Sequence, residues 1–386
     1  MSDEKKKIII IGPAYPYRGG NALFVSHTYY ALKVDFEVKI YNYKLLYPSI
    51  FFPGTTQMDE SEKKVFNVPN ERVINSISPF NWFSVANRLK RENADLIIFD
   101  WWHPFFGLCH GAIAYLIKNY YAKRILFITE NVVSHEANLI DSILTKIGLA
   151  NSSQFLVLSK KVEEELSRFS KGKKIFRSEL PVYDCYQDEI KEDKSAIKKE
   201  LEIDSDRKVI LFFGYVRKYK GLDILIEAFP KILSKHPDTH LLIVGEFYDK
   251  PDNYLNLIEK HSIANRVTII NKFVPNEEVY KYHMVSEVVV LPYRSATQSG
   301  ILNVAYGFHK PVIVTDVGGL AEFVAEGKTG LIVNPDSPDE IVNGYDRFRE
   351  LSSVENFEQN ITEHNRNNAF NNLPSLINSI LDSINI

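Results

Sequence analysis

The chain has almost no cysteine, since Cys109 and Cys185 are the only two among 386 residues. So few thiols exclude a disulfide framework and a zinc site built from cysteine. An excess of basic residues is also missing, because the formal net charge is −3. This balance argues against a nucleic-acid-binding protein, which usually carries a marked positive excess. What remains is an ordinary globular composition, with 45% hydrophobic and 25% charged residues.

Long hydrophobic runs are missing as well. No uninterrupted apolar segment reaches the roughly 18 residues that a membrane-spanning helix needs. The opening MSDEKKKIIII has too short an apolar stretch for a signal peptide before Gly12 intervenes. We therefore expect a cytoplasmic protein. At 386 residues the chain is too long for one ordinary core, so two domains are the natural interpretation.

Two motifs are absent where a cofactor enzyme would need them. A predicted strand over 8–11 is followed by GPAYPYRGG and a predicted helix over 21–32. The glycine spacing is not the G-x-G-x-x-G of a dinucleotide-binding turn, which disfavours a Rossmann oxidoreductase. No Asp-x-Asp motif occurs in the stretches that carry chemistry, so we expect no requirement for a divalent metal.

The stretch VILFFGYVRKYKGLDILIEA, residues 209–228, organises the rest of the chain. Its apolar, β-branched and aromatic start predicts a buried parallel strand over 209–213, and helical spacing of apolar residues resumes after Gly221. Arg217, Lys218 and Lys220 lie between the two elements. A cationic loop that leads into a helix N-terminus can hold an anion, although a solvated basic turn is the simpler interpretation. Arg217 can clamp phosphate oxygens as a fork, whereas Lys220 can act as a point charge.

A second anion-binding turn is predicted at Thr297-Gln298-Ser299-Gly300, directly before a helix over about 301–308. Small residues at a helix start offer free backbone N–H groups to a phosphate. Further strands are predicted between helices throughout the chain, which is the pattern of a doubly wound α/β fold. They cover residues 38–41, 96–99, 124–129, 155–159, 240–244, 267–270, 288–292, 312–315 and 330–333. The aromatic segment 41–54 fits neither a strand nor a long helix, and it either packs into the core or forms an apolar lip.

The spacing Gly214-x2-Arg217-x2-Lys220-Gly221 resembles the donor-diphosphate loop of family 4 glycosyltransferases, which are retaining enzymes of the GT-B fold. The C-terminal half resembles this family over most of its length. The resemblance implies two facing doubly wound (Rossmann-like) domains with an interdomain cleft. Residues 1–188 would form the acceptor-side domain, 189–206 a linker and 207–365 the nucleotide-sugar-binding domain. The helix over 366–386 would either cross back to the first domain or stay on its own.

The resemblance also assigns site residues. It gives a catalytic role to Arg217 and Lys220, which would neutralise the leaving diphosphate, and to His103, which would lie beside the anomeric carbon. Because the carboxyl ends of parallel strands face the ligand crevice, the position of His103 after strand 96–99 agrees with this role. Phe273 would pack against the nucleobase or belong to the core. The predicted donor-binding residues are Gly19, Gly20, Gly214, Arg217, Lys220, Phe273, Gln298, Ser299, Gly300 and Asn303.

The acceptor side would be built from residues that follow two strands of the first domain. Trp101 and Trp102 would supply apolar walls for sugar faces. Glu130 and His135 follow strand 124–129 and lie near the same crevice by position, although relatives often have His where this chain has Glu130. These four residues complete the predicted site.

The sequence departs from the family pattern at one point. Members usually carry two glutamates eight positions apart, and alignment through Lys310-Pro311-Val312 places Ala296 and Val304 at those positions. The second glutamate usually binds the donor ribose, so Gln298 or Asn303 would have to replace it.

These observations predict a retaining glycosyltransferase that moves a sugar from a nucleotide-sugar to a hydroxyl of a glycan or lipid-linked acceptor, without a cofactor. A GT-B sugar-nucleotide epimerase and a non-catalytic nucleotide-sugar-binding subunit are the alternatives. The basic segment 160–177 is either a solvated face or a patch that contacts the inner membrane surface. Polysaccharide or glycolipid biosynthesis is the expected setting.

Overall fold

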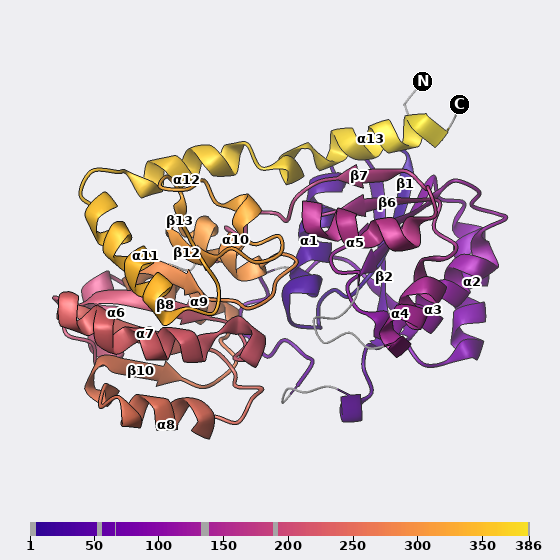
Figure 1. Ribbon diagram of the computed structural model, residues 1–386. Helices are drawn as coiled ribbons and strands as arrows, with labels where there is room; N and C mark the ends of the chain where they lie inside the picture. Colours follow the sequence, from indigo (N-terminus) through magenta and orange to yellow (C-terminus); the bar gives the residue numbers. More distant parts are fainter. Residues whose placement is uncertain (1–4, 52–55, 66, 133–138, 188–191, 385–386) are drawn as a thin grey trace. The chain divides into compact units, whose positions relative to one another are not determined.

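The computed structural model describes residues 5–51, 56–65, 67–132, 139–187 and 192–384 (Figure 1). The chain divides into two compact units. The first contains Met1–Asp59, Phe66–Pro181 and Asn368–Ile386, and the second contains Glu60–Val65 and Val182–Asn367. The C-terminal segment therefore belongs to the first unit.

A seven-stranded parallel sheet forms the centre of the first unit, in the order β3-β2-β1-β4-β5-β6-β7. The inner strands are nearly continuous apolar runs because helices cover both faces of the sheet. All six residues of β4 and all five of β5 are buried. The strands are β1 Lys7–Ile11, β2 Glu37–Leu45, β3 Glu71–Asn75, β4 Leu96–Trp101, β5 Ile125–Thr129, β6 Gln154–Val157 and β7 Ile175–Arg177.

Helices of the first unit pack on this sheet in two groups. The helix contacts join α2 to α3 and α3 to α4, whereas α1 contacts the C-terminal helix α13. Ile377 and Ile380 of α13 share a core with Phe24 of α1 and with Ile8 of β1. The helices are α1 Gly20–Leu32, α2 Pro79–Glu92, α3 Gly107–Ile117, α4 Leu139–Leu149, α5 Lys160–Ser170 and α13 Leu373–Ile384, with the 3-10 turns η1 Ser49–Phe51, η2 Pro104–Phe106 and η8 Ala369–Asn372.

The second unit repeats the plan with a six-stranded parallel sheet in the order β10-β9-β8-β11-β12-β13. Its strands are β8 Lys208–Phe213, β9 Thr239–Val244, β10 Val267–Ile270, β11 Ser286–Leu291, β12 Val312–Thr315 and β13 Gly330–Val333. Its helices are α6 Lys194–Glu200, α7 Leu222–Lys235, α8 Asp252–Lys260, α9 Val279–Val285, α10 Gly300–Gly307, α11 Pro338–Leu351 and α12 Phe357–Arg366. The 3-10 turns are η4 Lys218–Lys220, η5 Ala264–Arg266, η6 Asn276–Glu278 and η7 Ala321–Phe323.

Two parallel sheets with helices confirm the predicted α/β, doubly wound fold class. The prediction that residues 41–54 contain no strand was wrong for 41–45, because β2 continues to Leu45. The alternative that this segment packs into the core is confirmed for Tyr41 and Tyr43, which are completely buried. Strands β3 and β7 were not predicted, since each mixes charged residues into a short segment at a sheet edge. No helix in the described ranges is long and apolar enough to cross a membrane.

Candidate functional site

The turn between β8 and α7 brings Lys220 back against the end of its own strand. Arg217 precedes the short turn η4, and Gly221 begins α7 in a left-handed conformation with φ 67°. A Cβ atom on Gly221 would lie 1.9 Å from the carbonyl oxygen of Pro292, so only glycine fits there. The same construction places Lys220 Nζ 3.1 Å from the position of a Cβ atom on Gly214. The sequence spacing therefore produces a compact cationic turn.

Lys220 is a buried cation, with 6% of its surface exposed. Its Nζ lies 5.5 Å from the ring centroid of Tyr293 and 5.9 Å from that of Tyr215. Burial and, to a smaller extent, the charge of Arg217 lower the pKa of Lys220 to about 8. Arg217 lies over the ring of Tyr248, at 4.9 Å. Within the described part of the chain, neither cation forms an ion pair with a carboxylate, so both remain available to an anion.

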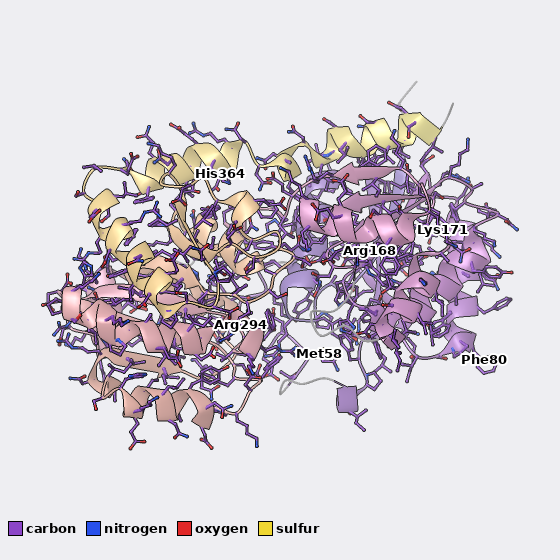
Figure 2. The ribbon with its side chains drawn as sticks, viewed as in Figure 1. Met58, Phe80, Arg168, Lys171, Arg294 and His364 are labelled. Atoms are coloured by element: carbon purple, nitrogen blue, oxygen red, sulfur yellow. The ribbon has the colours of Figure 1, made fainter. Side chains whose placement is uncertain are left out.

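Arg294, labelled in Figure 2, is a cation of the same region whose charge is neutralised by carboxylates. Its guanidinium donates two hydrogen bonds to Asp223, at 2.8 and 2.9 Å, and lies 2.9 Å from Asp336. It also donates to the carbonyl oxygen of Lys218, at 2.8 Å, and its backbone N–H donates to that of Tyr219, at 2.7 Å. Arg294 thus fixes the turn that carries Lys220, whereas its own charge is neutralised.

The N-terminus of α10 provides the second feature expected of a phosphate site. No side chain in the described ranges caps its backbone N–H groups at Ser299, whose hydroxyl lies 3.5 Å from the buried hydroxyl of Tyr293. Gln298 has a buried Oε1 atom that no described donor reaches. Asn303, in contrast, donates from its amide to the carbonyl oxygen of Ser299, at 3.3 Å. Gln298 is therefore better placed than Asn303 to meet a ligand.

The two positions that lack the family glutamates are apolar and enclosed. Ala296 and Val304 each keep 6% of their surface exposed. The carbonyl oxygen of Ala296 accepts a hydrogen bond from the backbone N–H of Gly319, at 3.2 Å. Phe273, predicted to contact the nucleobase, is half-buried in the segment after β10.

In the first unit, the loop after β1 carries Gly19 and Gly20 to the start of α1. Gly19 has φ 105°, and a Cβ atom on Gly20 would have no atom within 4 Å. The buried amide of Asn42 holds this loop, since its Nδ2 donates to the carbonyl oxygens of Ala14 and Tyr15, at 2.9 and 3.1 Å. Gly20 thus faces open space, whereas Gly19 is half-buried in a conformation that favours glycine.

His103 follows β4 and begins the turn η2. Its Nδ1 accepts a hydrogen bond from the backbone N–H of Phe105, at 3.1 Å, so the imidazole has a structural role as a helix cap. The residue is half-buried. His135 lies outside the described residues.

The interpretation of the two tryptophans was wrong. Trp101 is completely buried, and its ring packs so closely on Gly148 that a Cβ atom there would lie 2.3 Å away. Trp102 is 8% exposed, and its indole N–H donates to the hydroxyl of Tyr47, at 3.0 Å. Both belong to the hydrophobic core, because strand alternation directs Trp101 into the helix layer and the turn η2 covers Trp102.

Glu130 lies at the end of β5 and is nearly buried, with 6% exposed. Its Oε1 accepts a hydrogen bond from Nδ2 of Asn21, at 2.7 Å. It faces Asp100, the next-to-last residue of β4, which is 1% exposed. The sequence reasoning missed Asp100 and Asn21. The signal was present, since an acid ends each of two adjacent apolar strands.

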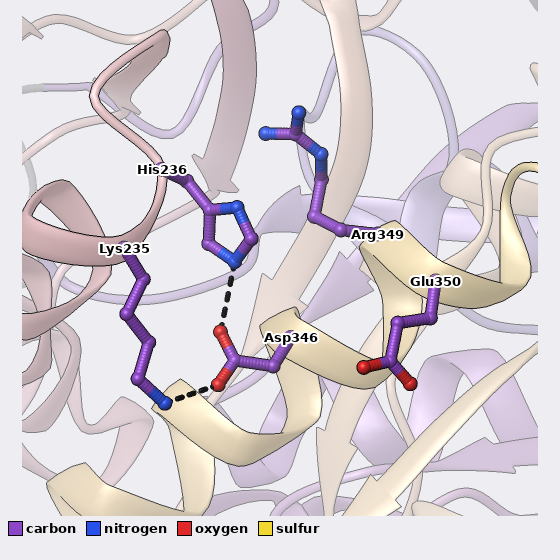
Figure 3. A pocket seen from close by; sticks show the side chains of 5 residues that line it. All are labelled: Lys235, His236, Asp346, Arg349 and Glu350. Atoms are coloured by element: carbon purple, nitrogen blue, oxygen red, sulfur yellow. Dashed lines mark hydrogen bonds and ion pairs between the residues drawn. The ribbon is translucent and has the colours of Figure 1, made fainter.

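A separate hollow of about 370 Å³ lies between α7 and α11 of the second unit (Figure 3). Lys235 and His236 both point to Asp346, and His236 Nε2 lies 2.8 Å from Asp346 Oδ1. Arg349 points away toward Asp238, with which it forms hydrogen bonds of 2.9 and 3.0 Å. The cations that line the hollow are thus neutralised by neighbouring carboxylates. The hollow therefore lacks the unpaired positive charge found in the Lys220 turn.

The two parallel sheets with their covering helices define the fold class of the protein. Two parallel α/β units of this kind make up the GT-B fold, and the solved structures agree. The Anabaena protein HepE in complex with UDP has a TM-score of 0.71 at 16% identity, over 98% of this chain and 100% of that one.

Sequence comparison finds a family profile that is similar to part of the chain. The profile described as "Glycosyl transferases group 1" matches residues 193–368, a range that contains Arg217, Lys220 and the α10 turn. This match covers a little under half of the chain and lies almost entirely within its second unit.

Individual relatives match over different lengths. An uncharacterized glycosyltransferase of Methanocaldococcus jannaschii is 32% identical over 156 residues, which cover 40% of this chain and 39% of that protein. This chain thus spans about two fifths of the length of that relative. The N-acetyl-alpha-D-glucosaminyl L-malate synthase of Bacillus anthracis is 25% identical over 301 residues, which cover 74% of this chain and 71% of that protein.

Proposed function

We propose that the protein transfers a glycosyl group, with retention, from a nucleotide-sugar to a hydroxyl of a glycan or lipid-linked acceptor. The observation that carries this proposal is the buried Lys220, which has no carboxylate partner in the described ranges and lies beside Arg217. An enclosed, uncompensated cation is costly unless it meets an anion. A diphosphate leaving group supplies that anion, and its negative charge grows as the sugar departs.

The known proteins support the same donor class. The HepE structure contains UDP. The family profile covers every predicted donor-binding residue of the second unit, whereas Gly19 and Gly20 of the first unit lie outside it. Under the proposal, Arg217 and Lys220 bind the diphosphate, the α10 N-terminus adds backbone N–H groups, and Gln298 contacts the ribose. Gly19 and Gly20 permit close approach of the donor, and His103 lies beside the anomeric carbon. No observation favours the epimerase or the non-catalytic subunit.

A lipid-linked acceptor is supported by an apolar surface on the first unit. Helix α4 exposes Leu139, Ile140 and Ile143, with 85%, 65% and 56% of their surfaces accessible. Helix α5 contacts α4 and forms the first part of the basic segment 160–177, where Arg168 and Lys171 are exposed (Figure 2). Apolar side chains next to cations suit peripheral contact with an anionic membrane surface.

Two measurements test the donor and the stereochemistry. A thermal-shift screen of UDP, GDP, ADP and their sugars should identify one base whose diphosphate raises the melting temperature, because a ligand that binds only the folded state stabilises it. Proton NMR of the first sugar product should then show the anomeric configuration of the donor. An inverted product would refute retention, and failure of every nucleoside diphosphate to bind would refute the donor assignment.

The membrane contact is tested by sedimentation with vesicles. We expect binding to vesicles that contain anionic lipid and weak binding to purely zwitterionic ones. Leu139→Ser with Ile143→Ser should abolish it, whereas Val354→Ser, which changes an exposed apolar residue of the second unit, should not. Equal sedimentation of wild type and the double variant would exclude this surface.

A further inference from the structure

Two buried carboxyl groups face each other at the carboxyl ends of β4 and β5. Strand register pairs Asp100 with Ile128, so Glu130 follows two residues later and points to the same face of the sheet. That face is covered by α1, because Ile98 and Ile128 share a core with Phe24 of that helix. The two acids therefore meet between the sheet and the first turns of α1.

The surroundings leave Asp100 without a donor. No described hydrogen-bond donor reaches either of its oxygens, although the side chain is 99% enclosed. Gly12 packs directly on it, since a Cβ atom there would lie 3.0 Å from Asp100 Cβ and 2.7 Å from Val25. The outer member of the pair, Glu130, has one defined donor, the amide of Asn21 at 2.7 Å.

Two carboxylates so enclosed cannot both ionise, because each charge is desolvated and repelled by the other. Burial and the neighbouring Glu130 raise the pKa of Asp100 well above its usual range. Burial raises the pKa of Glu130 to about 7, against the lowering effects of Asn21 and Asp100. The ionisable groups on the covering helix α1 are His27, Tyr29 and Tyr30. Arg18 precedes this helix, Lys33 caps its C-terminus, and His103 follows β4.

We propose that Asp100 and Glu130 share one proton and that the pair binds a hydroxyl group of the acceptor. Asp100 holds the proton and donates it in a hydrogen bond to Glu130, and a free lone pair on a carboxylate oxygen of Glu130 accepts a hydrogen bond from the acceptor hydroxyl. Glu130 thus contacts the substrate, and Asp100 acts through it as a positioning residue. The acceptor role rests on the proposed function, whereas the shared proton does not.

The contact with Asn21 favours a hydroxyl ligand over a metal ion. Asn21 presents an N–H donor to Glu130, and an N–H donor opposes a cation at the same oxygen. Oxygen-ligated Mg²⁺ or Ca²⁺ also requires six or more ligands, whereas the described residues place two carboxyls here. A hydroxyl requires one acceptor, which Glu130 offers.

The shared proton can be measured without any substrate, by infrared difference spectroscopy at pH 8. Wild type should show the carbonyl band of a protonated carboxylic acid. Asp100→Asn should lose this band, because the amide leaves Glu130 to ionise alone. Glu130→Gln should keep it, because Asp100 stays enclosed and protonated. Glu164→Gln, an exposed acid on α5, is the matched control. A spectrum that does not change in Asp100→Asn would overturn the shared proton.

Kinetics with the acceptor test whether the pair binds an acceptor hydroxyl. kcat/KM for the acceptor should fall as pH drops below about 7 in wild type. Glu130→Gln should lower it at least tenfold and remove this limb. Asp100→Asn should keep the limb because an amide still donates to Glu130, whereas Asp100→Leu should move it to higher pH.

Nucleoside diphosphate binding should be unchanged in all variants, which shows that they fold. Acceptor kinetics that Glu130→Gln leaves unchanged would overturn hydroxyl binding. If wild type transfers no sugar at all, the proposed function fails, and the infrared result still decides the proton.

Discussion

At the ends of the central strands, the second unit carries two basic side chains and the first unit carries two acidic ones. In the second unit, the turn after β8 holds Arg217 and the buried Lys220 without a carboxylate partner in the described ranges. In the first unit, β4 and β5 end in the buried acids Asp100 and Glu130 without a described cationic partner. Burial acts on both in opposite directions, lowering the pKa of Lys220 to about 8 and raising that of Glu130 to about 7.

This difference indicates what each unit is prepared to bind. A cationic turn beside a helix N-terminus suits an anion that carries several oxygens, such as a diphosphate. A carboxyl pair with one proton carries a single negative charge and offers a hydrogen-bond acceptor, which suits a neutral hydroxyl donor. Elsewhere in the described chain, charges such as Arg294 with Asp223 are paired. The unpaired groups are therefore the ones that point to ligands.

The largest effect should come from removing both cations of the turn. Arg217→Ala with Lys220→Ala should lower turnover by about a thousandfold, because electrostatic stabilisation of the leaving group is lost. The exposed Lys218→Ala, in the same turn, is the control and should stay near wild type. Initial rates with saturating donor measure the effect. Near-normal turnover in the double variant would show that these two cations do not stabilise the leaving group.

His103→Ala should lower turnover by about a hundredfold while nucleoside diphosphate affinity changes little, because its position after β4 belongs to the other unit from Lys220. The imidazole also caps η2, so His103→Asn supplies the control: an amide oxygen can accept the Phe105 N–H and restore the turn. Recovery of turnover in His103→Asn would show that the cap, and not the chemistry, requires His103.

Gln298→Ala should weaken nucleoside diphosphate binding by about fivefold, the effect of one neutral hydrogen bond. Asn303→Ala should weaken it less, because that amide is already bonded to Ser299. Calorimetry on both variants decides between them. A larger loss with Asn303→Ala would transfer the proposed ribose contact to α10.

The smallest effects concern the pH dependence of the free energy of unfolding. Its slope with pH has opposite signs for Lys220 in the second unit and Glu130 in the first. The folded state binds one proton fewer at Lys220 between about pH 8 and 10.5, so the free energy of unfolding rises with pH in that window. At Glu130 the folded state binds one proton more between pH 4.5 and about 7, so the free energy of unfolding falls as pH rises.

Melting temperatures across pH test both windows in the apo protein. Lys220→Met should remove the rise above pH 8, and Glu130→Gln should reduce the fall below pH 7. Lys218→Met and Glu164→Gln, both exposed, are the controls. Identical pH profiles for wild type and the two buried variants would contradict the burial argument.

The sequence was most informative where chemistry and local geometry coincide. The Gly214–Gly221 spacing predicted the cationic turn because glycine and strand signals are local, and strand β10 lies at the predicted residues 267–270. The sequence shows an acid near the end of each of two apolar strands, but the contact between Asp100 and Glu130 depends on strand register across 30 positions, which the sequence does not give. Trp101 was misplaced for a different reason: the predicted strand ended at residue 99, whereas β4 continues to Trp101 and buries it.

Calorimetry with the best-binding nucleoside diphosphate and its monophosphate tests the central claim most directly. Wild type should bind the diphosphate more tightly, because Arg217 and Lys220 contact the second phosphate. In Arg217→Ala with Lys220→Ala, the two affinities should become equal while the melting temperature stays close to that of wild type. Undiminished preference for the diphosphate in the double variant, or no binding by wild type at millimolar concentration, would contradict the account.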